Sequence, residues 1–296
     1  MRSVVVVSFI LKMDQLRGAA TTDEILAELG DRLRRYRLQQ NRTLAHVAAG
    51  AGVNMRTAQR AESGENPTMA TVIRLLRALG RLDALDAFPA SCGRIEYAYS
   101  RLARAAGVEM GETHLLCERD FAHFMTRRFD REGDARLHMH SLGGLHHADY
   151  NVRQVMSYEQ YFRTIRLLGM GQTAVDQAFR RMIFNMATRN QDDHVKNLAF
   201  LMTPDGSWRL APAFDLTFSY GGKWAATHQM TAGGKDDHFT RRDLLQLGAS
   251  FDVPNGGAEI LGDVDGALGL WEGAAREAGV ERVMIARIGA LFRRFG

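Results

Sequence analysis

Cysteine is scarce in this chain of 296 residues, which contains only Cys92 and Cys117. The two lie far apart and belong to no paired-cysteine motif, which argues against both a disulfide framework and a zinc site. Long apolar runs are also missing, since no stretch approaches the roughly 18 consecutive apolar residues of a membrane-spanning helix. These absences favour a cytoplasmic protein without a membrane partner.

The N-terminus combines a basic start with the short apolar run VVVVSFIL, so a signal peptide has to be considered. Lys12 and Asp14 close this run after a few residues. We therefore interpret residues 1–20 as a poorly structured leader, with Met13 as an alternative start of the chain.

The excess of positive charge is confined to the first third of the chain. Residues 1–92 contain 13 Lys and Arg against 9 Asp and Glu, whereas residues 93–296 contain 25 of each kind. A local basic surplus on a small domain is typical of proteins with a polyanionic partner. On charge alone, a solvated arginine-rich helix face explains the surplus equally well.

Between residues 23 and 80, apolar spacing and capping residues predict a series of helices. Thr43 and Asn54 are placed to cap two short helices, and Gly52 ends the first of them. Two short helices joined by the turn AGVN, with a longer helix on each side, are the layout of a helix-turn-helix. The candidate contacts to bases and phosphates are Thr43, Asn54, Arg56, Thr57, Gln59 and Arg60.

Residues 25–80 resemble the phage-repressor-like family of helix-turn-helix domains, on the run NRTLAHVAAGAGVNMRTAQRAESGENPTMATVIRLLRALG. The resemblance implies a five-helix DNA-binding domain over residues 21–90 that binds operator DNA as a homodimer on paired half-sites. The alternative is a small helical bundle with surface arginines and no DNA ligand.

The stretch NQDDHVKN, residues 190–197, places several chargeable groups before a predicted β-hairpin. A helical region over residues 161–187 precedes it, and the strand candidates LAFLM and SWRLAPAF flank the turn TPDG. Asp215 follows the second strand. Phosphoryl transfer needs an acid that accepts a hydroxyl proton, and an Asn and an Asp that hold Mg²⁺ against the nucleotide.

Asp192 and Asn197 have the five-residue spacing that protein kinases use for the base and the metal-binding Asn. This pattern makes Asp192 the candidate base, and Asn197 and Asp215 the candidate Mg²⁺ ligands. Lys196 is placed to neutralise phosphate charge. His194 completes the catalytic group as a residue that orients the loop through a hydrogen bond, and Asp193 is expected in solvent or behind the ligands.

Residues 96 to about 290 resemble the C-terminal lobe of the HipA family of serine/threonine kinases, toxins of bacterial toxin–antitoxin modules. The matching phrases are MTRRFDR (125–131), NQDDHVKN (190–197) and LAPAFDL (210–216). The resemblance implies ATP as a cofactor beside Mg²⁺, with Arg127 and Phe129 next to the adenine and Asp130 fixing that segment. It also implies transfer of the γ-phosphoryl group to a protein hydroxyl, with an aminoacyl-tRNA synthetase as a candidate substrate.

In this family the neighbouring antitoxin is a repressor-like helix-turn-helix protein. The chain is therefore expected to join a HipB-like domain at residues 21–90 to a HipA-like kinase C-terminal lobe at residues 93–296. The fold class that follows is α+β, mainly helical with a small β component. The expected partners are operator DNA and a protein substrate or toxin–antitoxin partner.

The departure from the family is the N-terminal lobe, which carries a glycine-containing phosphate loop and a lysine. Between residues 93 and 124 there is neither a glycine-rich turn flanked by strands nor any lysine. Without that lobe the nucleotide loses about half of its enclosure. An inactive relic, a split kinase and a partner-binding transcriptional regulator therefore all stay open, and so does the question of enzyme activity.

Two other interpretations of residues 190–197 are kept. The first is a polar loop without chemistry. The second is a hydrolytic metal site with Asp192, Asp193 and His194 as ligands, for which His146 and His147 are available. A surface loop is the expected place of all four histidines of this region, His138, His140, His146 and His147.

Overall fold

The computed structural model describes residues 5–6, 22–65, 67–80, 91–118, 121–133, 135–221 and 224–296. The chain divides into a small unit, residues 9–89 with 221–224, and a large unit, residues 1–8, 90–220 and 225–296. Helices dominate and the sheets are small, which confirms the predicted α+β class. None of the helices among the described residues is both long enough and apolar enough to cross a membrane.

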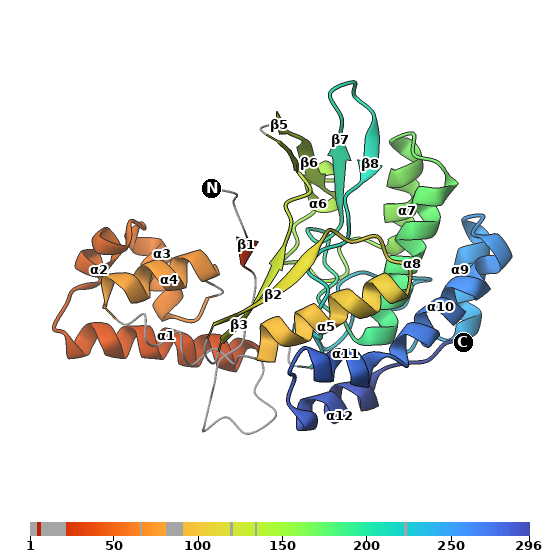
Figure 1. The fold of residues 1–296 in the computed structure, drawn as a ribbon. Helices are drawn as coiled ribbons and strands as arrows, with labels where there is room; N and C mark the ends of the chain where they lie inside the picture. The colour runs from red at the N-terminus through yellow and green to blue at the C-terminus, as the bar shows by residue number, and fades with distance from the viewer. Residues whose placement is uncertain are drawn as a thin grey trace. The chain divides into compact units, whose positions relative to one another are not determined.

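The small unit contains the helices α1 (Thr22–Gln39), α2 (Leu44–Ala51), α3 (Met55–Glu62) and α4 (Met69–Ala78), shown in Figure 1. Thr43 and Asn54 are the N-caps of α2 and α3, because their side chains accept hydrogen bonds from the N–H groups of His46 and Thr57. Gly52 ends α2 in the left-handed region, at φ 63°. These caps confirm the predicted positions of the two short helices.

The core of the small unit is apolar. It consists of Leu29, Leu33, Val47, Ala48, Ala51, Ala58, Ala61, Val72, Leu75, Leu76 and Leu79. The described part of this unit holds four helices rather than the predicted five, and residues 81–90, which would follow α4, lie outside it.

The large unit begins with a three-stranded antiparallel sheet in the order β1–β3–β2. It also contains β2 (Thr113–Glu118) and β3 (Phe121–Thr126), and α5 (Ser91–Ala105) packs against both of these strands. Strand β1 (Val5–Val6) pairs with Thr126 and Met125 of β3. At these two residues the chain is a strand and not the predicted unstructured leader, whose other positions lie outside the described residues.

A second antiparallel sheet has the order β6–β7–β8. Strands β7 (Ala199–Met202) and β8 (Trp208–Leu210) confirm the predicted hairpin, and Figure 1 shows them side by side with β6 (His138–Ser141). The expectation that His138 and His140 lie in a loop is wrong, since both pair with β7 in this strand. The short strands β4 (Arg131–Glu132) and β5 (Ala135–Arg136) form a hairpin before it, and α6 (Leu142–Leu145) follows.

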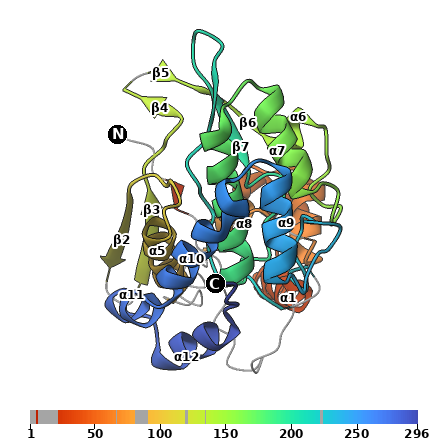
Figure 2. The same cartoon turned by 90° about the vertical axis from the view of Figure 1, so that its right-hand side faces the viewer.

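The predicted helical region 161–187 is two helices, α7 (Tyr158–Leu167) and α8 (Gln172–Thr188). The break falls at Gly169, whose φ of 76° favours glycine. Helix α8 carries eleven buried residues and packs against α7 and α10 (Ala258–Leu268), as Figure 2 shows. The remaining elements are α9 (Arg241–Ser250), the 3-10 helix η2 (Pro254–Gly257), α11 (Trp271–Glu277) and α12 (Arg282–Leu291).

Candidate active site

The loop 190–198 leaves the end of α8 and enters β7, and its first residues are fixed by hydrogen bonds. Arg189 caps α8 in the left-handed region at φ 59°, which turns the chain out of the helix. The N–H of Gln191 donates to the carbonyl of Ser219 (2.9 Å), and the N–H of Ser219 donates to that of Arg189 (3.0 Å). The loop is therefore held against the segment that follows Asp215.

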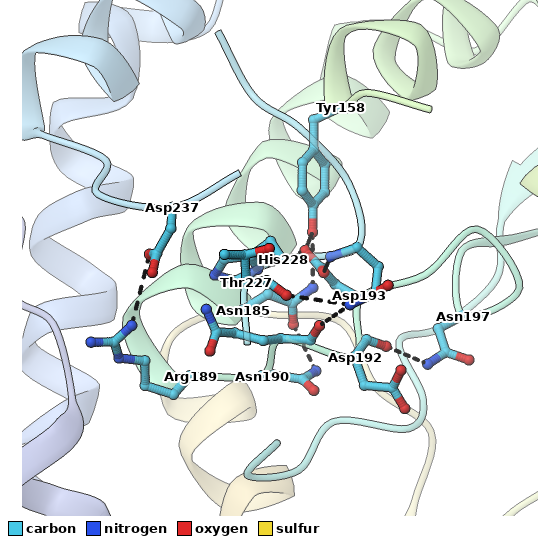
Figure 3. Close-up of polar contacts among 12 residues, drawn as sticks. Tyr158, Asn185, Arg189, Asn190, Asp192, Asp193, Asn197, Thr227, His228 and Asp237 are labelled. Atoms are coloured by element: carbon cyan, nitrogen blue, oxygen red, sulfur yellow. Dashed lines mark hydrogen bonds and ion pairs between the residues drawn. The ribbon is translucent and has the colours of Figure 1, made fainter. Parts of the chain in front are cut away.

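Three predicted residues, Asp192, Asn197 and Asp215, come together and are called the outer cluster here. The side-chain amide of Asn197 donates to the carbonyl oxygen of Asp192 (3.0 Å), as Figure 3 shows. Burial raises the pKa of Asp215, the charge of Asp192 raises it further, and His194 and a hydrogen bond with Asn197 act in the opposite direction. The two acids thus lie close enough to repel each other.

The two other predicted members of the loop lie beside Tyr150. The ammonium of Lys196 is exposed and sits 3.1 Å from the centroid of the Tyr150 ring, a cation–π arrangement. The His194 ring meets Tyr150 edge-on, and its Nε2 lies 3.9 Å from Asp192 Oδ1. The buried Nδ1 of His194 has no hydrogen-bond partner among the described residues, whereas its carbonyl accepts from the N–H of Asn197 (2.9 Å). That the His194 side chain orients the loop through a hydrogen bond stays a prediction.

Asp193 points away from Asp192 into the core. Its Oδ2 accepts a hydrogen bond from the Tyr158 hydroxyl (2.7 Å) and lies 2.9 Å from His228 Nδ1, and its Oδ1 accepts from the N–H of Gln229 (2.8 Å). Asp193 is 1% exposed, and Tyr158 and His228 are fully buried. We call these four residues the inner cluster, of which Figure 3 labels Tyr158, Asp193 and His228. Asp193 was expected either in solvent or behind the metal ligands, and its burial excludes the first of these.

The predicted adenine-side segment is tied to the outer cluster through aromatic packing. The rings of Phe129 and Phe214 pack at 5.6 Å between centroids, and Phe214 directly precedes Asp215. The N–H of Arg127 donates to the carbonyl of Glu112 (2.9 Å). Hydrogen bonding by Arg128 is the main cause that lowers the pKa of Asp130, whose carbonyl accepts from the N–H of Leu137 (3.0 Å).

Glu96 on α5 was missed in the sequence. It is 5% exposed, and burial, followed by the charge of Asp215, raises its pKa well above the usual range. A signal was available, because Glu96 sits between Ile95 and Tyr99 on the apolar face of an amphipathic helix, where an acid is out of place. Glu96 adds a third carboxyl group near the outer cluster.

The hydrolytic metal site that the sequence left open is not formed. No group of three or more His, Cys, Asp or Glu side chains in the described parts of the chain is placed to hold a metal ion. Asp193 belongs to the inner cluster, and His146 Nε2 is bonded to Thr164 Oγ1 (2.8 Å).

In the small unit, the candidate DNA contacts fall into two groups. Thr43 and Asn54 use their side-chain oxygens for the caps of α2 and α3. Arg56, Gln59 and Arg60 are exposed on α3 and Thr57 is half-buried; the guanidinium of Arg60 also pairs with Glu65 at 3.1 Å.

The sequence model of the HipA-like C-terminal domain matches residues 43–271, and the chain therefore belongs to this family. No curated protein matches the chain.

Among solved structures, the chain is similar to one from the Shewanella oneidensis MR-1 toxin–antitoxin complex of HipA, HipB and its operator DNA. The identity is 17% and the TM-score 0.53, over 67% of this chain and 53% of the other. The chain thus spans about half the length of that structure, and the likeness shows the fold alone. A match to the Helicobacter pylori proinflammatory kinase CtkA has 10% identity and a TM-score of 0.41, over 67% and 82%, which is too low to carry an argument.

Proposed function

We propose that this chain is a toxin–antitoxin-type protein that combines operator DNA binding with Mg-ATP-dependent phosphoryl transfer to a serine or threonine of a protein. The observation that carries the kinase part is the outer cluster, in which Asp192, Asn197 and Asp215 interact with one another. Family membership and the fold support the same assignment.

In this proposal Asp192 accepts the proton of the attacking hydroxyl. Its side chain is 38% exposed, so a protein substrate can reach it. Asn197 and Asp215 offer hard oxygen donors that suit Mg²⁺. Burial and the charge of Asp192 raise the pKa of Asp215, which fits this role, because a bound divalent cation would offset both effects. Bound Mg²⁺ would hold the phosphates and offset their charge.

The remaining groups position the nucleotide and the loop. Main-chain groups around Arg127 and Phe129 would face the adenine, with Asp130 fixing that segment through Arg128. Lys196 would neutralise phosphate charge from its exposed position beside Tyr150. His194 would support Asp192 at 3.9 Å rather than carry a proton.

The alternative is a catalytically inactive regulator or a lobe completed by a partner chain. The observation that favours it concerns α5 and the first sheet, since residues 5–6, 91–118 and 121–126 contain no lysine. In kinases a lysine from this layer pairs with a helix glutamate and the ATP phosphates. Glu96 is the buried acid in this layer, and its raised pKa fits a carboxyl group without such a partner.

The kinase part is tested by incubating the full chain with labelled ATP and Mg²⁺, alone and with candidate acceptors that include aminoacyl-tRNA synthetases. Asp192→Ala is expected to reduce transfer by about 10²–10⁴-fold. Asp205→Asn, which alters an exposed acid in the turn of the adjacent hairpin, serves as the control and should leave transfer unchanged. Labelling that survives in Asp192→Ala removes the base assignment, and absence of labelling in the wild type favours the inactive regulator.

The DNA-binding part rests on the exposed polar face of α3. In a gel shift with the region upstream of its own gene, Arg56→Ala is expected to cost about 1–3 kcal/mol of specific binding. Arg34→Ala alters an arginine exposed on α1 and is the matched control. Binding as a homodimer predicts a two-fold symmetric footprint, whereas equal losses in both variants would indicate unspecific attraction to phosphates.

A further inference from the structure

Two arginines from distant parts of the sequence meet at one carboxylate close to the inner cluster. Arg189 is the last residue before the loop 190–198, and Arg293 lies beyond α12. A guanidinium nitrogen of Arg293 hydrogen-bonds Asp237 Oδ1, and Arg189 Nη1 lies 3.8 Å from the same oxygen. Figure 3 shows Arg189 pointing at Asp237. The three side chains are only 12–15% exposed.

The charges at this place do not balance, because two cations share one anion. Burial lowers the pKa of Arg189, and the nearby charge of Arg293 lowers it further. Burial alone would raise the pKa of Asp237, but the hydrogen bond from Arg293 and the charges of both arginines lower it. Each arginine also has a buried Nη1 without a hydrogen-bond partner among the described residues. The two arginines therefore favour an oxyanion between them, which supplies both negative charge and hydrogen-bond acceptors.

The same carboxylate is linked to the loop of the outer cluster. Asp237 follows Asp236, whose carbonyl accepts from the N–H of His228 (3.0 Å), and His228 and Gln229 hold Asp193. On the other side, Arg189 Nε donates to the carbonyl of Leu291 (3.0 Å), and the N–H of Arg293 donates to that of Ala187 (2.9 Å). Asp237 thus joins the segment behind the loop to the residues that precede it.

We propose that Arg189 and Arg293 form an oxyanion-binding site whose resident ligand is the carboxylate of Asp237, and that Asp237 is a positioning residue for the loop that carries Asp192. The first part is independent of the proposed function, and the second rests on it. Paired guanidinium groups recognise carboxylate, phosphate and sulfate through charge-assisted hydrogen bonds. A free oxyanion should therefore take the place of the carboxylate when the latter is removed.

The test of the binding site is thermal unfolding of the full chain in phosphate and in chloride at equal ionic strength. Asp237→Ala is expected to lower the Tm by roughly 5–10 °C in chloride and to regain more than half of this in phosphate, with a saturable dose response. Asp263→Ala is the matched control, because Asp263 is half exposed and pairs with the single arginine Arg180. It should show no response specific to phosphate.

The double variant Asp237→Ala with Arg293→Gln separates the site from general salt effects. Recovery in phosphate should disappear in it, and a recovery that persists overturns the proposal. If Asp237→Ala is unfolded in chloride, phosphate is expected to restore the folded state. A variant that is unfolded in both salts also overturns the proposal.

The positioning role is tested by phosphoryl transfer with sulfate as the added anion. Asp237→Ala should lower kcat by at least tenfold with little change in the KM for ATP, and sulfate should restore part of kcat. A change in KM alone, or loss of kcat without rescue in a variant whose Tm is rescued, removes this role. If the wild type is inactive, the kinase proposal fails, while the Tm experiment still decides on the oxyanion site.

Discussion

The two neighbouring acids of the loop, Asp192 and Asp193, face opposite environments. Asp193 is buried, and three partners of the inner cluster saturate its oxygens at 2.7–2.9 Å. Asp192 is 38% exposed and lies close enough to Asp215 to raise the pKa of that acid. Buried polar groups that are fully hydrogen-bonded contribute to the fold, whereas groups held against like charge are typical of sites that bind or react.

The outer cluster also contains a strained backbone. Asp215 has a φ of 56°, in the left-handed region that non-glycine residues rarely adopt. Such conformations cost of order 1–3 kcal/mol and persist where the surrounding structure enforces them. The comparison indicates that the inner cluster stabilises the folded state, whereas the like charges and the backbone conformation of the outer cluster destabilise it.

The largest effect should come from removing the carboxylate of the inner cluster. Asp193→Ala leaves Tyr158, His228 and the N–H of Gln229 buried without their acceptor, and the free energy of unfolding should fall by about 3–5 kcal/mol. Asp192→Ala should change it by less than about 0.5 kcal/mol. Urea unfolding of both variants checks this, and equal losses would contradict the division into two clusters.

A smaller effect is expected from a single donor of the inner cluster. Tyr158→Phe removes the hydroxyl that donates to Asp193 and accepts from Asn185 (3.2 Å), at a cost of about 1–2 kcal/mol. Tyr220→Phe, which changes a residue that is 40% exposed, should cost less than about 0.5 kcal/mol. The same urea experiment measures both, and a neutral Tyr158→Phe would show that the inner cluster tolerates loss of a donor.

In the outer cluster, neutralising an acid should raise the free energy of unfolding instead of lowering it. The folded-state pKa of Asp215 is raised, so its ionised form is disfavoured by folding, and its cost to stability appears as the pH rises through that pKa. Asp215→Asn should therefore stabilise the nucleotide-free protein by about 1 kcal/mol at neutral pH and abolish Mg-dependent transfer.

The difference in the free energy of unfolding between the Asp215→Asn variant and the wild type should become smaller as the pH is lowered toward about 4. Calorimetry at several pH values measures it. Asp205→Asn is the control of opposite sign, because hydrogen bonding by Thr203 lowers the pKa of this exposed acid. Destabilisation in Asp215→Asn at neutral pH would contradict the prediction.

The smallest effect concerns an acid outside both clusters. The hydrogen bond from Lys235, followed by those from Thr240, lowers the pKa of Asp243 from 3.8 to about 2. The ionised Asp243 therefore stabilises the folded protein fully above pH 3.8, and this stabilisation is lost as the pH falls through about 2. Asp243→Asn should cost less than about 1 kcal/mol at neutral pH, since it weakens one capping box, and should flatten the acid limb of a Tm-against-pH curve.

Local signals account for what the sequence predicted correctly. The caps Thr43 and Asn54, the hairpin around the turn 203–206 and the meeting of Asp192 with Asn197 all depend on residues within a few positions of each other. The approach of Asp215 was predicted across a hairpin whose length is fixed by its turn. In each case the backbone between the residues leaves little freedom.

Two of the features that were missed depend on residues that are far apart in the sequence. Asp193 and His228 are 35 residues apart, and no periodicity connects a loop acid with a histidine in an irregular segment. The pairing of β1 with β3 spans more than 100 residues. The break between α7 and α8 was a local signal that was overlooked, since Gly169 and Gly171 interrupt the helical pattern.

The ring contact between Phe129 and Phe214 joins the two ends of the proposed nucleotide site. We expect a shift of the segment around Arg127 to be transmitted through these rings to Phe214, which directly precedes Asp215. By thermodynamic reciprocity, adenosine and the cation would then strengthen each other's binding by the same factor. Shortening Phe129 to Ala would uncouple them, so that each still binds while the cooperativity between them is lost.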